Sequence, residues 1–160
     1  MRAGCILLDL QMAGVNGFEL QECLAKSDNV LPPIVFLTAH GDIKAGVHAI
    51  KAGAEDFLPK PATKEALFDC IERALARNLE QRQRQDRLKA MRALVASLTP
   101  REQEVFALVV RGKLNKQIAH ELGTTLRTIK AHRQSAMEKL GVKSFAEAVS
   151  IAEPLGMLAR

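Results

Sequence analysis

In the first half of the chain, short apolar runs alternate with segments whose apolar residues recur every three or four positions. The runs at 5–8, 34–37 and 56–58 predict β-strands, and the segments 15–25 and 42–52 predict helices. Thr63 is expected to cap a further helix with the same spacing. Continuously apolar strands that alternate with helices are typical of a parallel sheet covered on both faces. The pattern therefore predicts an α/β first domain.

In the second half, the apolar positions follow helical spacing throughout. Residues 99–102 and 144–147 each match the capping-box pattern at the start of a helix, and Asn115 is expected to cap another. A third helix is expected to end at Leu140, with Gly141 as its C-cap. The pattern predicts four helices, of which the second and third are joined by a tight turn at 123–125, as in a helix-turn-helix.

Between the two halves, residues 78–87 contain no Gly or Pro and one apolar residue, which predicts an exposed helical linker. An apolar stripe then resumes, and we expect it to pack within the chain rather than against a second copy. The stripe consists of Leu88, Met91, Leu94, Val95 and Leu98. The predicted organisation is an α/β domain at 1–77, a linker at 78–97 and a helical domain at 98–160.

Charge divides the chain in the same place. Residues 1–75 carry 7 Lys or Arg and 10 Asp or Glu, a balance of −3, whereas residues 76–160 carry 16 and 8, a balance of +8. A basic module attracts polyanions, nucleic acid first among them. No apolar run approaches the ~20 residues of a membrane helix, and the three cysteines form no metal-binding or disulfide pattern. We therefore expect a cytoplasmic protein with free thiols and no membrane partner.

Three polar side chains are predicted at the carboxyl edge of the sheet, where ligands gather in parallel α/β folds. Asp9, Thr38 and Lys60 each follow one of the three strands. An acid, a hydroxyl and an amine delivered by three separate strand ends indicate a functional site at this edge rather than three unrelated polar residues.

The third helix of the second domain is predicted to turn one face inward and to offer the other to a DNA groove. The inward face is expected to hold Leu126, Ile129, Ala136, Met137 and Leu140. Lys130, Ala131 and Gln134 are placed to reach base edges. The residues expected to contact DNA more generally, most of them at phosphates, are Lys116, Thr125, Arg127, Thr128 and Arg133.

The motifs LTPREQEV at 98–105, NKQIA at 115–119 and RTIKAHR at 127–133 resemble the LuxR-type DNA-binding domain of the NarL/FixJ response regulators. The resemblance implies a four-helix fold whose third helix reads double-stranded DNA and whose fourth helix, from Phe145, pairs two copies on an inverted repeat. Pro154 is expected to end or kink that fourth helix.

Residues 5–75 resemble a response-regulator receiver domain, a flavodoxin-like fold. The resemblance implies that Asp9 accepts a phosphoryl group from a sensor histidine kinase, that Thr38 and Lys60 bind it, and that the Lys60-Pro61 bond is cis. Ala13 stands where the family usually has Pro. Movement of Thr38 would pass the signal on, as in a two-state switch.

The resemblance also implies Mg²⁺, held in receivers by the acceptor Asp, a backbone carbonyl and an acidic pair on the first strand. Asp9 and the carbonyl of Gln11 match, but only eight residues precede Asp9, and no acidic pair is among them. The first domain thus looks like a partial receiver without its first strands. We expect Mg²⁺ binding to be doubtful and phosphotransfer to Asp9 to be impaired.

The leading hypothesis is a DNA-binding transcriptional regulator of a two-component phosphorelay that dimerises on DNA, with RNA polymerase as a further candidate partner. One alternative is a phosphorylation-independent DNA-binding or decoy protein that pairs with another regulator. A remote alternative is a phosphohydrolase with Asp9 as nucleophile, which Gln11 disfavours because such enzymes need a general acid at that position.

Overall fold

The computed structural model describes residues 4–12, 16–26, 31–39 and 43–158. It divides into two compact units, residues 1–84 and 85–160, each with its own core. In the first unit, three strands form a parallel sheet in the order β1-β2-β3, with β1 at Ile6–Asp9, β2 at Ile34–Thr38 and β3 at Asp56–Pro59. The predicted strands and their parallel arrangement are therefore confirmed.

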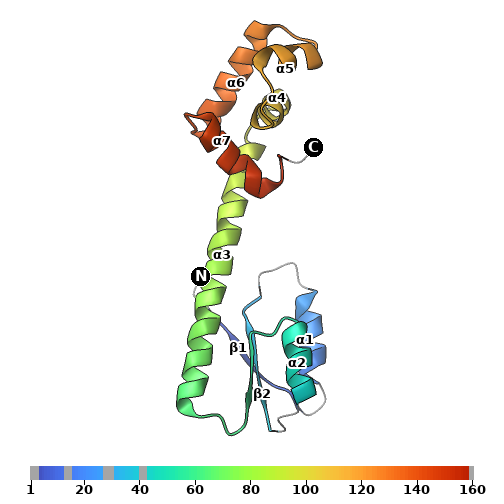
Figure 1. The fold of residues 1–160 in the computed structure, drawn as a ribbon, viewed down its shortest axis with the longest axis vertical. Coiled ribbons are helices and arrows are strands. Elements are labelled where there is room, and N and C mark those ends of the chain that lie inside the picture. The colour runs from blue at the N-terminus through green and yellow to red at the C-terminus, as the bar shows by residue number, and fades with distance from the viewer. Residues whose placement is uncertain (1–3, 13–15, 27–30, 40–42, 159–160) are drawn as a thin grey trace. The chain divides into compact units, whose positions relative to one another are not determined.

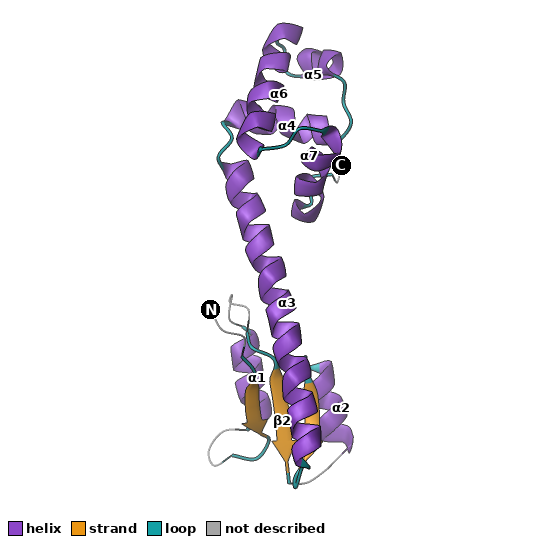
Figure 2. Ribbon diagram, turned by 90° about the vertical axis from the view of Figure 1, so that its left-hand side faces the viewer, coloured by secondary structure: helices purple, strands orange, loops and turns teal. Residues whose placement is uncertain are grey.

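Helices cover both faces of this sheet, as the apolar strands require (Figures 1 and 2). Helices α1 (Gly17–Ala25) and α2 (Ile43–Lys51) lie on one face, where Leu8, Phe36 and Ala49 form the main core. Helix α3 (Lys64–Ala96) covers the other face with its first turns. The unit is therefore a three-layer α/β sandwich.

The α3 face of the sheet carries a small second core around Cys70. The Cys70 side chain is fully buried with Val35 and Ala74. Burial, together with a hydrogen bond to the Asp56 carboxylate, raises the pKa of the Cys70 thiol to about 11. Cys23 is exposed and Cys5 half-buried, and all three cysteines are free thiols, as predicted.

Helix α3 runs without interruption through the segment predicted as an exposed linker. It holds no Gly or Pro over its 33 residues, so nothing in it stops a helix. The expectation of complete exposure is wrong at Asn78, which is fully buried and accepts a hydrogen bond from the Gly4 amide at 3.3 Å. Its Nδ2, also buried, has no hydrogen-bond partner among the described residues, and hydrophobicity alone could not predict the burial of this side chain.

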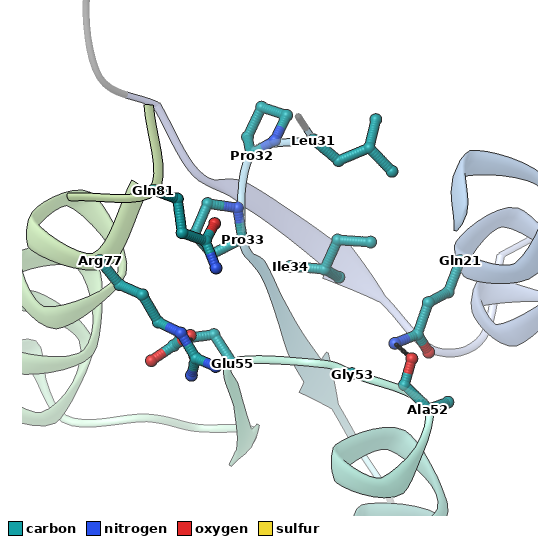
Figure 3. Close-up of a pocket in the computed structure, with 10 residues that line it drawn as sticks. All are labelled: Gln21, Leu31, Pro32, Pro33, Ile34, Ala52, Gly53, Glu55, Arg77 and Gln81. Carbon is teal, nitrogen blue, oxygen red and sulfur yellow. Dashed lines mark hydrogen bonds and ion pairs between the residues drawn. The ribbon is translucent and has the colours of Figure 1, made fainter. Parts of the chain in front are cut away.

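A cavity of about 200 Å³ lies at the opposite edge of the sheet from Asp9, where β2 begins (Figure 3). Its wall includes Pro33 and the buried Gln21, whose amide donates a hydrogen bond to the Ala52 carbonyl at 3.0 Å. Across it, Arg77 pairs with Glu55 at 2.8 Å. These contacts tie α1, α2 and α3 to the amino edge of the sheet.

The second unit holds four further helices after the end of α3. They are α4 (Pro100–Val110), α5 (Asn115–Glu121), α6 (Leu126–Leu140) and α7 (Phe145–Ala152), followed by the 3₁₀ turn η1 (Glu153–Leu155). Met91 and Val95 of α3 pack on the core formed by Leu98, Phe106 and its neighbours, so the predicted packing within the chain is confirmed for them. Leu94 is an exception, since 39% of it is exposed.

The helix ends follow the predicted chemistry with two corrections. Thr99 and Glu102 form the predicted capping box, Gly141 ends α6 in a left-handed conformation, and Pro154 stands in η1, where α7 has ended. Asn115, however, does not cap α5: it is the first helical residue, and its side chain accepts a hydrogen bond from Arg133. In the second predicted box, the Glu147 carboxylate accepts from the amide of Lys143 instead of Ser144.

Candidate functional site

At the carboxyl edge of the sheet, the structure brings Asp9 and Lys60 into direct contact. Lys60 Nζ donates to Asp9 Oδ2 at 2.6 Å, although the two residues are 51 positions apart in sequence. They meet because β1 and β3 flank β2 in parallel and end at the same edge. The following Lys60-Pro61 bond is cis, as the resemblance implied.

The loop after β1 positions the Asp9 carboxylate from the other side. The Gln11 amide donates to Asp9 Oδ1 at 3.1 Å. Gly17 allows α1 to begin directly against this loop, because a Cβ on Gly17 would lie 2.8 Å from the Asp9 carbonyl oxygen and 2.9 Å from the Phe36 ring. Residues 13–15 of the predicted acceptor loop, including Ala13, lie outside the described residues.

The hydrogen bond from Lys60, followed by that from the Gln11 amide, lowers the pKa of Asp9 below its ordinary value. The side chains of Lys60 and Asp9 are 42% and 37% exposed. A solvent-exposed ion pair of this kind contributes little to stability, so the pair is better explained by the chemistry of the site than by folding. A carboxylate that is ionised and open to solvent is able to act as a nucleophile.

Thr38 ends β2, between the other two site residues in the strand order. Its side chain is buried, with 1% exposed, and its carbonyl accepts a hydrogen bond from the Lys60 amide at 2.6 Å. The three strand-end residues predicted from the sequence are thus on neighbouring strands at one edge. The predicted helical residue Asp42 and the adjoining positions 40–41 lie outside the described residues.

Among the described residues, this edge offers few oxygen ligands for the expected Mg²⁺. Mg²⁺ takes six oxygen ligands in octahedral geometry. In the described part of the chain, no group of three or more His, Cys, Asp or Glu side chains could hold a metal ion. Asp9 and the carbonyl of Gln11 would supply two ligands, and both Asp9 carboxylate oxygens already accept hydrogen bonds.

In the second unit, α5 and α6 form the predicted helix-turn-helix. Ile118 of α5 and Ile129 of α6 are fully buried against Val105 of α4, which fixes the two helices to each other. The Thr125 hydroxyl caps α6 by accepting from the Thr128 amide at 3.1 Å. We call the exposed side of α6, together with Lys116 at the start of α5, the outer face.

The outer face holds most of the residues predicted to contact DNA. The exposed ones are Lys116, Thr125, Arg127, Lys130, Ala131 and Gln134, and Thr128 is half-buried. Arg133 is also half-buried, and its Nη1 donates to Asn115 Oδ1 at 3.0 Å. The sequence analysis missed this contact with Asn115, although an amide at the start of one helix and a guanidinium on the next are a familiar hydrogen-bonding pair.

The predicted inward face of α6 is right at Ile129, Ala136 and Leu140, which are buried, and wrong at Leu126, which is 36% exposed. At 100° per residue, position 126 falls in line with 133 and 137 rather than with 129. Arg133 and Met137 are half-buried as well. Leu126 therefore belongs to the edge of the buried face.

Glu102 connects α4 to α6 by contacts that the sequence did not predict. Its side chain, 6% exposed, accepts from Ser135 Oγ at 2.6 Å and pairs with Lys139 Nζ at 2.7 Å. The hydrogen bond from Lys139, followed by those from Ser135 and the Thr99 amide, lowers the pKa of Glu102 to about 2. One carboxylate thus caps α4 and holds the C-terminal half of α6.

Two family models match the chain, one for each unit. Residues 1–72 match the response regulator receiver domain, and residues 96–152 match the bacterial regulatory proteins of the luxR family.

No helix among the described residues has the length and apolar character that a membrane span requires.

Individual proteins resemble the chain over nearly its whole length. It is 39% identical to nodulation protein W of Bradyrhizobium diazoefficiens, over 97% of this chain and 68% of that protein. It is 42% identical to the transcriptional regulatory protein TdiR of Thauera aromatica, over 88% and 62%. The solved structure of the response regulator StyR is 50% identical, with a TM-score of 0.80 over 95% of this chain and 76% of that one. The chain spans about two thirds of the length of the two curated relatives.

Proposed function

The chain belongs to the two-component response regulators that join a receiver domain to a LuxR-type DNA-binding domain, and from that membership we propose that it binds duplex DNA through α6. Members of this family are transcriptional regulators rather than enzymes, so the phosphohydrolase alternative is set aside. The observation that carries the proposal is the exposed outer face of α6 in a basic unit, with Lys130, Ala131 and Gln134 side by side.

In this proposal, the residues of the outer face divide the work of recognition. Lys130 and Gln134 reach base edges, and Ala131 lets the helix approach and contacts a thymine methyl. Lys116, Arg127 and Arg133 bind phosphates and set the register, with Thr125 and Thr128 beside them at the first turn of α6. The domain boundaries at 77 and 97 remain part of the proposal.

DNA binding is tested with the full chain and a labelled duplex selected from a randomised pool. Lys130→Ala should weaken binding by about 1–3 kcal/mol and relax specificity at one base position. Fluorescence anisotropy at fixed salt measures the affinity. Wild-type affinity in the Lys130→Ala variant would argue against α6 as the recognition helix.

For the first unit, we propose that Asp9 is the phosphoryl acceptor and that the phosphoryl group comes from a sensor histidine kinase. Lys60 would neutralise the transferred phosphoryl oxygens and Thr38 would hydrogen-bond one of them. Receiver domains generally bind Mg²⁺, whereas the described residues here offer two ligands. Phosphorylation of this chain is therefore expected to be weak or absent, and DNA binding to proceed without it.

Incubation with a small phosphodonor and Mg²⁺, followed by intact-mass measurement, tests the second assignment. The expected result is little or no mass increase, with Asp9→Asn as the matched control. Stoichiometric phosphorylation that disappears in Asp9→Asn would overturn the expectation of impaired transfer while supporting Asp9 as the acceptor.

The remaining partners are proposals of the same kind. Pairing of two chains through α7 on an inverted repeat would double the DNA contacts. Light scattering of the protein with one and with two half-sites measures this, and a 1:1 complex on both would exclude it. A decoy role, in which the chain pairs with another regulator, and contact with RNA polymerase are further candidates that come second to DNA binding.

A further inference from the structure

A groove of about 340 Å³ runs beside the recognition helix on its exposed side. Three elements line it: Asn115 at the start of α5, Lys130, Arg133 and Gln134 on α6, and Lys143 and Phe145 after α6. Asn115, Lys143 and Phe145 have no role in the DNA contacts assigned above. The groove therefore extends the outer face of α6 toward the segment that connects α6 to α7.

The charge of this groove is one-sided. Its lining includes three cations and no carboxylate. Two glutamates that are not part of the lining contact lining residues: Glu138 accepts from the Gln134 side chain at 3.0 Å, and Glu147 accepts from the Lys143 backbone amide at 2.7 Å. Concentrated positive charge with no built-in counter-ion favours an anionic ligand.

The two lysines of the groove differ in their contacts from Lys113 and Lys139 of the same unit. Lys139 is paired with Glu102, and Lys113 with Glu121. Among the residues that the structure describes, the ammonium groups of Lys130 and Lys143 have no hydrogen-bond or ion-pair partner. Both residues are exposed, so each can reach a ligand without breaking an existing contact.

Arg133 completes the groove as an oriented cation. Its Nη1 donates to Asn115 Oδ1 at 3.0 Å, a neutral acceptor that fixes the guanidinium without neutralising it. A guanidinium keeps further donors in a planar fork that matches the geometry of a phosphate. Asn115 is therefore a positioning residue, whose effect on a ligand would pass through Arg133.

We infer that this groove binds a backbone phosphate of duplex DNA, with Lys143 as a contact beyond the recognition helix and Arg133 held in place by Asn115. The inference rests on the proposed DNA-binding function. DNA is favoured over a free anion because the groove is continuous with Lys130 and Gln134, the residues that face the bases. A duplex seated on α6 would bring its phosphate strand past the groove.

The test uses the salt dependence of binding by the full chain. Each phosphate contact contributes about 0.9 to the slope of log affinity against log salt, whatever the DNA sequence. Lys143→Gln should lower the slope by about that amount and weaken binding equally on a selected and an unrelated duplex. Lys89→Gln removes an equal charge from an exposed position of α3 in the same unit and should leave the slope unchanged.

A second variant tests the positioning role. Asn115→Asp keeps the size of the side chain and places an acid in the first turn of α5, where it favours the helix. The new carboxylate would pair with Arg133 and remove it from the ligand, so the salt slope should fall as in Lys143→Gln. Thermal melts of all variants provide the check on folding.

The outcomes separate the inference from the function on which it rests. A slope that stays at the wild-type value in Lys143→Gln and in Asn115→Asp would overturn the groove as a phosphate site, even if Lys130→Ala still loses affinity. If the wild-type chain binds no duplex at low salt, the proposed function itself fails and the inference with it.

Discussion

At the residue scale, the described contacts separate what sequence position can predict from what it cannot. Asp9 and Lys60 could be paired in advance because both end strands of one parallel sheet, and such ends share an edge. The contacts of Asn78 and Glu102 could not be predicted in this way. Each is a buried polar side chain whose partner is distant in the sequence. Hydrophobic periodicity places polar residues on the surface by default, so buried polar side chains escape it.

The first residue-scale prediction concerns the acid–lysine contact. Replacing Lys60 with Gln removes the main cause of the lowered Asp9 pKa, so this pKa should rise toward its ordinary value. Carbon-detected NMR of the Asp9 carboxyl through a pH titration measures it. Lys64→Gln, an exposed lysine four residues on, serves as the control and should leave the midpoint unchanged. An equal midpoint in Lys60→Gln would show that the pair does not form in solution.

The second concerns Glu102, whose folded-state pKa of about 2 lies below its ordinary 4.5. A depressed pKa adds stability that is present above the ordinary value and is lost as the pH falls through the folded one. The second unit should therefore lose stability between pH 4.5 and about 2. Glu102→Gln should be less stable at pH 7 and less sensitive to acid in this window.

Urea unfolding at pH 7 and pH 3 checks this prediction. Glu104→Gln is the matched control, because the Glu104 side chain is 51% exposed and forms an ion pair with Arg101 at the surface. It should change the unfolding free energy by less than about 0.5 kcal/mol. Identical acid sensitivity of wild type and Glu102→Gln would contradict the role given to the ion pair.

At the element scale, helix existence was easier to predict than the facing of each residue. The ends of α4 and α6 could be predicted from capping residues and glycines because these signals are local in the sequence. The error at Leu126 arose from applying three-residue spacing to the edge of a face, where one position decides burial. The start of α1 carries a capping box formed by Asn16 and Glu19, and Gly17 lets the helix approach the Asp9 loop.

That close approach yields an element-scale prediction. Gly17→Ala places a methyl 2.8 Å from a backbone oxygen and 2.9 Å from a ring, so α1 or the loop must shift. Overpacking of this kind costs about 1–3 kcal/mol. Chemical denaturation of the first unit measures the loss. Gly4→Ala, which meets nothing within 4 Å, should be close to neutral, and equal losses in both variants would contradict the packing argument.

At the scale of the whole molecule, charge and motifs predicted two modules, and the two compact units agree in number with that expectation. The continuity of α3 was implicit in the absence of Gly and Pro from 64–96, yet its division between the units depends on packing at Asn78 and Met91.

Each unit has a core of its own. Phe106→Ala should therefore destabilise the second unit by about 3–5 kcal/mol.

Hydrogen exchange resolved by residue tests that prediction. Amides of α4 and α6 should exchange faster in Phe106→Ala, whereas those of β2 should keep their wild-type protection. Leu94→Ala removes a half-exposed apolar side chain of the same unit and should have a much smaller effect. Equal loss of protection in β2 would show that the chain unfolds as one cooperative body.

The rate at which the buried Cys70 thiol is alkylated reports how often α3 separates from the sheet of the first unit. Alkylating reagents attack thiolates, and with a pKa of about 11 in the folded state only about one in a thousand buried Cys70 side chains would be ionised at pH 8. Cys23, which is exposed on α1, should be modified at once. Cys70 should be modified only when α3 separates from the sheet. The lag between the two labels on one molecule would time how often that helix opens, with no engineered probe.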